Sequence, residues 1–68
     1  MKQTQRVHEY MQRFGSITQA QAFEDIGVSR LAARIDDLRN SGVAISSEWV
    51  KRTNRYGEKV MIKRYRLV

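Results

Sequence analysis

The sequence predicts an α+β fold in which three short helices come first and a β-hairpin follows. Apolar residues recur at helical spacing up to about residue 41, and after Gly42 the pattern changes to the two-residue alternation of strands. The charge is uneven as well, because residues 51–68 carry seven Lys or Arg against one Glu, whereas residues 1–50 carry six cations and six acids. With 68 residues and no proline, low-complexity segment or repeat, the chain is expected to form one domain, residues 1–68.

The first helix is expected over about residues 4–14, ending at Gly15. Four apolar side chains at i, i+3, i+4 and i+7 form its inward stripe: Val7, Tyr10, Met11 and Phe14. At this spacing they are expected to be core residues.

The second helix is expected over about residues 19–26. Thr18 with Gln21 three residues later matches the capping-box pattern at its start, and Gly27 ends it. Its inward side chains are expected to be Ala22, Phe23 and Ile26.

The third helix, over about residues 30–41, has two distinct faces. Ser29 is the expected cap, Gly42 supplies the left-handed residue that ends the helix, and the inward stripe is Leu31, Ile35 and Leu38. The residues expected away from this stripe are Arg30, Ala33, Asp37 and Asn40, with Arg34 on the flank. Arg30 and Arg34 are four residues apart and repel each other, which suits a surface facing an anion, and Asp37 could offset one of them.

Two strands are expected over about residues 44–52 and 60–67. Between them Asn54 and Gly57 provide turn chemistry, so the pair predicts a hairpin with a basic tip. The side chains expected to face inward are Val43, Ile45, Trp49, Tyr65 and Leu67. Ser16 and Ile17 are candidates for a short third strand.

Only Gly27 and Val28 separate the second helix from Ser29. A helix, a tight glycine-containing turn and a second helix with a basic outer face form the helix-turn-helix pattern, in which the second helix enters the major groove. Three helices followed by a hairpin constitute the winged-helix arrangement.

Several stretches of the chain resemble small winged helix-turn-helix domains of bacteriophages and prophages. The most specific are the dipeptide Ile17-Thr18, the run from Gly27 to Leu31, the helix-three segment from Ala33 to Arg39, Gly42, and the wing segment from Asn54 to Gly57. The resemblance covers nearly the whole chain. It implies double-stranded DNA as the partner and a regulator, or another DNA-handling protein of a mobile element, as the role.

Within such a domain, base reading and backbone contact fall to different residues. Arg30 and Arg34 are the candidates for guanine O6 and N7, and Ala33 is small enough to touch a thymine methyl group. The backbone and wing candidates are Thr18, Gln19, Gln21, Ser29, Lys51, Arg52, Asn54, Arg55, Tyr56, Lys59 and Arg64. Arg55 at the wing tip could enter a minor groove. Charged residues on edge strands also block aggregation, and the two roles can coexist.

Other classes of function remain open. A winged helix can also serve as a protein-interaction module, for example an inhibitor of a host protein, with Glu24, Asp25, Asp36 and Asp37 on its working face. A homodimer or a larger protein partner is also open. RNA binding is disfavoured, because Tyr56 is the only aromatic residue clearly expected outside the core.

The composition argues against catalysis. One histidine, no cysteine and dispersed carboxylates provide no nucleophile-base pair and no metal constellation, so no enzyme activity, metal, cofactor or small-molecule substrate is expected. No apolar run reaches membrane-spanning length and the amino terminus lacks a signal-peptide core. The expected location is the cytoplasm. The protein would be either nucleoid-associated in a bacterium or encoded by a phage and present in the host cytoplasm.

Overall fold

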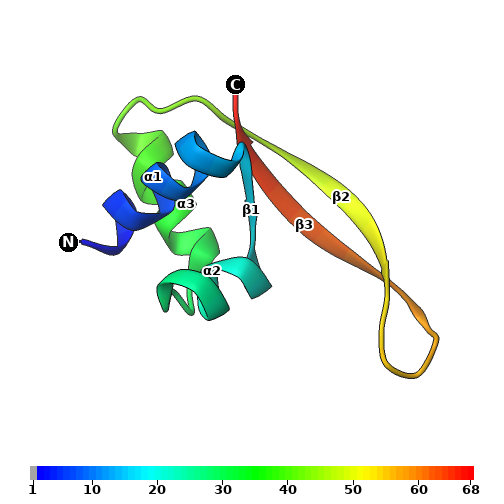
Figure 1. The fold of residues 1–68 in the computed structure, drawn as a ribbon. Helices are drawn as coiled ribbons and strands as arrows, with labels where there is room; N and C mark the ends of the chain where they lie inside the picture. Colours follow the sequence, from blue (N-terminus) through cyan, green and yellow to red (C-terminus); the bar gives the residue numbers. More distant parts are fainter. Residues whose placement is uncertain (1) are drawn as a thin grey trace.

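The computed structural model describes residues 2–68 and has the predicted winged-helix α+β architecture (Figure 1). Its elements in chain order are α1 (Gln3–Phe14), β1 (Ser16–Thr18), α2 (Gln19–Ile26), α3 (Leu31–Asn40), β2 (Ile45–Thr53) and β3 (Lys59–Leu67). Each boundary of the three helices and two hairpin strands lies within one residue of the predicted position. The short third strand is also present, as β1.

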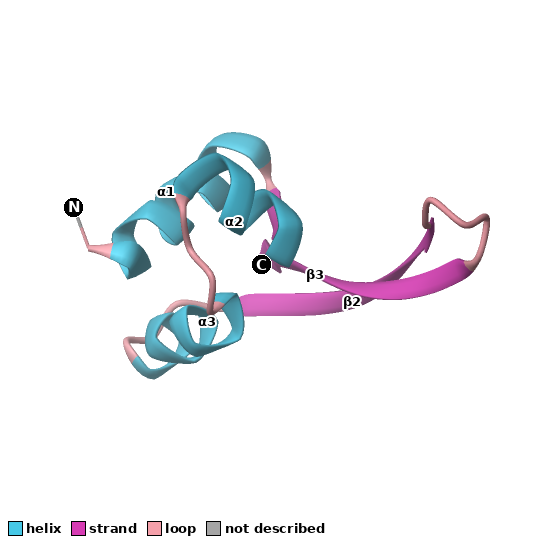
Figure 2. Ribbon diagram, turned by 90° about the horizontal axis from the view of Figure 1, so that it is seen from below, coloured by secondary structure: helices cyan, strands magenta, loops and turns pink. Residues whose placement is uncertain are grey.

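The three strands form one antiparallel sheet in the order β1-β3-β2. β2 pairs with β3 along its whole length, from Ile45 opposite Leu67 to Thr53 opposite Lys59. β1 pairs only with Arg64 to Arg66. From Lys63 outward the hairpin is therefore a two-stranded ribbon, which leaves the helices sideways (Figures 1 and 2) and makes the molecule 38 × 22 × 20 Å.

The core lies where the three helices meet the root of the sheet. Its buried residues are Val7, Met11, Ile17, Ala22, Val28, Leu31, Ile35, Leu38, Ile45 and Tyr65. Partly buried apolar side chains pack around them: Tyr10, Ile26, Val43 and Leu67. The predicted stripe of α3 is thus confirmed. So is its left-handed ending, because Gly42 has φ 96° and lets the Val43 N–H donate to the Leu38 carbonyl.

Three aromatic residues expected in the core are exposed instead: Phe14 by 64%, Phe23 by 62% and Trp49 by 64%. Phe14 is the last residue of α1, and its ring packs on Tyr10 with 4.6 Å between centroids rather than on the core. Phe23 lies about 100° around α2 from the buried Ala22, whereas Ile26, four residues on from Ala22, lies within about 40° of it. The short α2 therefore buries only one narrow stripe.

Trp49 lies on the predicted face of the sheet but too far along it. It is two residues from Ser47, which pairs with the buried Tyr65, so Trp49 and Tyr65 share a face. At this point the helices no longer cover the face of the sheet, and β1 no longer pairs with β3. Four aromatic residues rather than Tyr56 alone are exposed, so the prediction that the others all lie in the core was wrong, and a lack of exposed rings does not argue against RNA.

The start of α3 also differs from the prediction. Arg30, not Ser29, is the N-cap, and it makes no side-chain capping bond. The side chain of Gln19, in α2, caps the start of α3 instead. Its Oε1 accepts from the Leu31 N–H at 3.2 Å, and its Nε2 donates to the Val28 carbonyl at 3.3 Å. One amide thus fixes the turn between α2 and α3.

We expect Gln19→Ala to lower the free energy of unfolding by about 1 to 3 kcal/mol, because the partly buried Leu31 N–H loses its acceptor. Urea unfolding followed by circular dichroism measures this. Gln12→Ala is the matched control, since Gln12 is an exposed helical glutamine that hydrogen-bonds to no side chain in the described part of the chain. Equal stability of the two variants would contradict the capping role.

Candidate nucleic-acid interface

A small hollow lies where the start of α2, the first turn of α3 and the root of the wing meet. Its volume is about 150 Å³, and it is lined by Thr18, Gln19, Ala20, Ala32, Ile62, Lys63 and Tyr65. Ala20 and Ala32 present only methyl groups here. The side chains therefore allow a close approach to both helices.

The face of the ribbon on the helix side carries aromatic, apolar and cationic groups together. Cross-strand partners share a face, so Trp49 with Lys63 and Lys51 with Met61 continue outward from the buried Tyr65. Lys63 Nζ lies 5.7 Å from the Trp49 ring centre and 5.6 Å from that of Tyr65. These distances fit cation–π contacts with both rings.

The opposite face of the wing holds Arg64 and Arg66 in internal ion pairs, whereas Arg52 on the same face has no ion pair in the described range. Arg64 donates from Nε and Nη2 to Glu48 Oε1 at 2.9 and 2.6 Å, and Arg66 lies 3.6 Å from the same oxygen. The hydrogen bond from Arg64 lowers the pKa of Glu48 below its ordinary value. Arg64, expected to contact phosphate, is thus already paired with a carboxylate.

The wing tip is closed by Asn54. Its Oδ1 accepts from the backbone N–H groups of Tyr56 and Glu58, both at 3.0 Å, and its Nδ2 donates to Glu58 Oε1 at 3.3 Å. Asn54 therefore shapes the loop, whereas Arg55 and Tyr56 point outward, with Tyr56 87% exposed.

The exposed surface of α3 is less basic than the sequence suggested. Arg34 lies on the side of α1, with Nη1 3.5 Å from Gln3 Oε1. Its Nε lies 3.3 Å from Asp37 Oδ2, the expected offsetting contact, but the buried Nε makes no hydrogen bond among the described residues. Arg39 donates to the Ile45 carbonyl at 3.0 Å. Arg30 remains exposed at the amino-terminal end of the helix.

The predicted capping box at α2 is confirmed. Thr18 Oγ1 accepts from the Gln21 N–H at 3.3 Å, and the Thr18 N–H donates to Gln21 Oε1 at 3.0 Å. Both side chains, like that of Gln19, are engaged within the protein.

The candidate residues thus divide into engaged and free groups. Within residues 2–68 the exposed cations of this region without an ion pair or side-chain hydrogen bond are Arg30, Lys51, Arg52, Arg55, Lys59 and Lys63. Ser29 and Tyr56 are exposed, and Ala33 is half-buried. Lys63, Trp49 and Ala32 also lie around the helix-side face of the wing and its hollow, and the sequence did not single them out. The alternation of β3 relative to Tyr65 was the available signal for Lys63, but only the strand register pairs it with Trp49.

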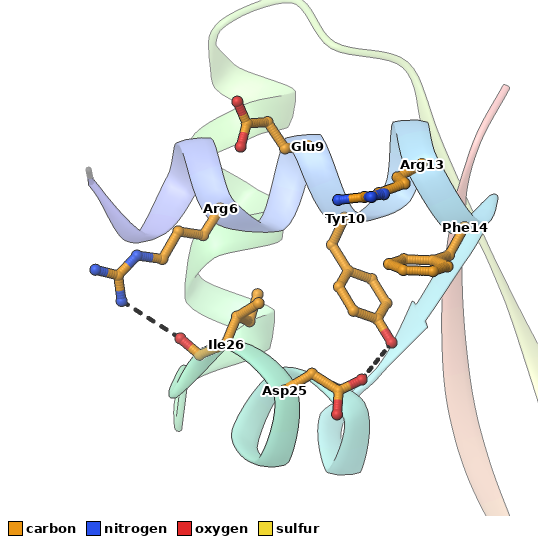
Figure 3. Close-up of a pocket in the computed structure, with 7 residues that line it drawn as sticks. All are labelled: Arg6, Glu9, Tyr10, Arg13, Phe14, Asp25 and Ile26. Carbon is orange, nitrogen blue, oxygen red and sulfur yellow. Dashed lines mark hydrogen bonds between the residues drawn. The ribbon is translucent and has the colours of Figure 1, made fainter.

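A larger pocket of about 430 Å³ lies between α1 and α2, away from these residues (Figure 3). It is lined by Arg6, Glu9, Tyr10, Arg13, Phe14, Asp25 and Ile26. The Tyr10 hydroxyl donates to Asp25 Oδ2 at 2.6 Å, which raises the pKa of Tyr10 to about 12. This bond and the contact of Arg6 with the Ile26 carbonyl tie α1 to α2.

The three helices and the basic wing are those of a winged helix-turn-helix domain, and comparison with known families gives the same result. A family model described as a winged helix-turn-helix domain matches residues 2–68, so the chain belongs to this family. Such a domain is typically a non-catalytic DNA-binding unit. No curated protein and no solved structure matches the chain.

Two kinds of feature are absent from the described residues. No helix in residues 2–68 is long and apolar enough to cross a membrane. In the same range, no three side chains of the His, Asp or Glu type gather as a metal site would require.

We expect Glu48→Gln to destabilise the protein at neutral pH but not in acid. The pKa of Glu48 is lowered on folding, so its stabilising contribution is present above the ordinary value of 4.5 and is lost as the pH falls through the folded value. Urea unfolding of the parent and the variant between pH 3 and 7 measures the difference. Glu24→Gln, which removes an exposed glutamate without an ion pair in the described range, is the control. A difference that does not depend on pH would contradict the ion-pair explanation.

Proposed function

We propose that this chain binds double-stranded DNA as a regulator, or as an excisionase-like architectural protein, of a phage or another mobile element. The observation that carries the proposal is the set of free cations on this winged helix-turn-helix domain: Arg30 at the start of α3 and five Lys or Arg on the wing. A concentrated field of one sign attracts phosphate. The host cytoplasm is the proposed location.

In the proposed complex the wing supplies most of the phosphate contacts. Lys51, Arg52 and Lys59 extend from the ribbon and Arg55 from its tip, and their ammonium and guanidinium groups have no internal partner to give up within residues 2–68. Each such contact releases about 0.9 of a condensed counterion. Arg64 contributes less, because binding phosphate requires it to leave Glu48.

Sequence reading is assigned to the amino-terminal end of α3 in the major groove. Arg30 is exposed and free to make a bidentate contact with guanine, and Ala33 can approach a thymine methyl group. Arg34 reads a base only if its contacts with Gln3 and Asp37 break. Asp36 and Asp37, exposed further along α3, repel phosphate, which favours an approach by the start of the helix rather than by its end.

A protein-interaction module is the second candidate. The exposed rings of Phe14 and Phe23 favour it, since neither lies on the wing and Phe14 borders the pocket between α1 and α2. A homodimer on DNA or a larger protein partner would use such a surface.

We expect Arg55→Ala to weaken binding to all duplex sequences alike and to flatten the salt dependence. Removing one phosphate contact should reduce the slope of log K against log salt by about 0.9. Fluorescence anisotropy with a labelled random-sequence duplex at several salt concentrations measures the slope. Arg13→Ala removes an arginine on α1, outside the wing, and should leave the slope unchanged. A slope equally reduced in both variants would point to net charge alone.

In contrast to Arg55→Ala, we expect Arg30→Ala to reduce the discrimination between DNA sequences. After a preferred site has been selected from a random pool, the variant should lose about 1 to 3 kcal/mol of its preference for that site over a random duplex. Competition binding of the two duplexes measures the preference. An equal loss of affinity for both would show that Arg30 contacts only the backbone.

A further inference from the structure

The wing exposes aromatic rings that phosphate binding does not use. Trp49 is 64% exposed on the ribbon and Tyr56 is 87% exposed at its tip, and neither ring packs into the core. Trp and Tyr are enriched at interfaces, so these two rings are candidates for contact with a partner.

The groups around Trp49 are complementary to a partner that is anionic and has flat apolar parts. Lys63 Nζ lies 5.7 Å from the indole centre, Lys51 stands two residues further along the same face, and Met61 opposite it is 51% exposed. The hollow of about 150 Å³ beside Lys63 extends this face to the methyl groups of Ala20 and Ala32. A second copy of the wing would be a poor occupant, because residues 51–68 carry seven cations and one acid.

We propose that Trp49 and Lys63 form a stacking site for an unpaired DNA base. The inference rests on the proposed DNA binding and names the form of the substrate, a duplex that adjoins an unpaired stretch. In an intact duplex the neighbouring base pairs cover the faces of each base and only the edges reach the grooves. An unpaired base presents its face to the indole, and the ammonium groups of Lys63 and Lys51 neutralise the flanking phosphates.

Trp49 is the only tryptophan of the chain, so its fluorescence reports on this site alone. The probes are a fully paired duplex and the same duplex with three mismatched thymine pairs in its centre. We expect the mismatched duplex to quench Trp49 fluorescence in a saturable way, and the paired duplex to leave it nearly unchanged. Anisotropy should show tighter binding to the mismatched duplex.

Variants assign that preference to the ring. Trp49→Ala should weaken binding to the mismatched duplex by roughly 5- to 150-fold, the range expected for loss of one stacked base, and should leave the paired duplex nearly unaffected. Trp49→Phe should restore part of the loss because it keeps an aromatic face. Phe23→Ala is the matched control, since Phe23 is as exposed as Trp49 but lies on α2. Circular dichroism checks that each variant is folded.

The outcomes separate this inference from the proposed function. Equal affinity for the two duplexes, or equal quenching by both, would overturn the stacking site while leaving duplex binding intact. A preference for the mismatched duplex that survives in Trp49→Ala would also overturn it, because the flexibility of the DNA would then explain the preference. Absence of binding to either duplex at low salt would overturn the proposed function itself.

Discussion

The central place of β3 in the sheet is the constraint on which the rest of the molecule depends. Its last residues pair with β1 on one side and with β2 on the other, and Tyr65 at this point is buried in the helical core. The same strand that closes the core therefore continues outward as half of the wing. Alternation then fixes which side chains point toward the helices all the way along the ribbon, so the position of Tyr65 decides the composition of both wing faces.

Those two faces are both basic but differ in how their cations are partnered. On one face Glu48 draws Arg64 and Arg66 into ion pairs, and on the other Lys51 and Lys63 have no carboxylate partner in the described range. A single acidic residue, Glu48, thus makes the two faces of the wing differ in how many of their cations are ion-paired. On α3, Asp37 and the Ile45 carbonyl similarly occupy Arg34 and Arg39 and leave Arg30 free.

Much of the fold could be predicted from the sequence because its signals are local. The period of the α3 stripe, the capping box at Thr18 and the left-handed glycine after α3 each depend on neighbours within a turn, and each was confirmed. The errors concern how far the core extends. The pattern assigned Trp49 to the correct face, yet its exposure depends on where the helices stop. Likewise, the partner of Arg34 on α1 and the cap supplied by Gln19 are contacts between elements that periodicity does not encode.

The position of Gln19 links two events that the sequence gives no reason to connect. Its amide holds the first turn of α3 and at the same time forms part of the wall of the hollow beside the wing. A ligand atom that hydrogen-bonded to this amide would compete with the Leu31 N–H for the oxygen or with the Val28 carbonyl for the nitrogen. Binding of such a ligand in the hollow would therefore be coupled to the setting of α3 relative to α2, because it would remove a hydrogen bond that fixes the turn between them.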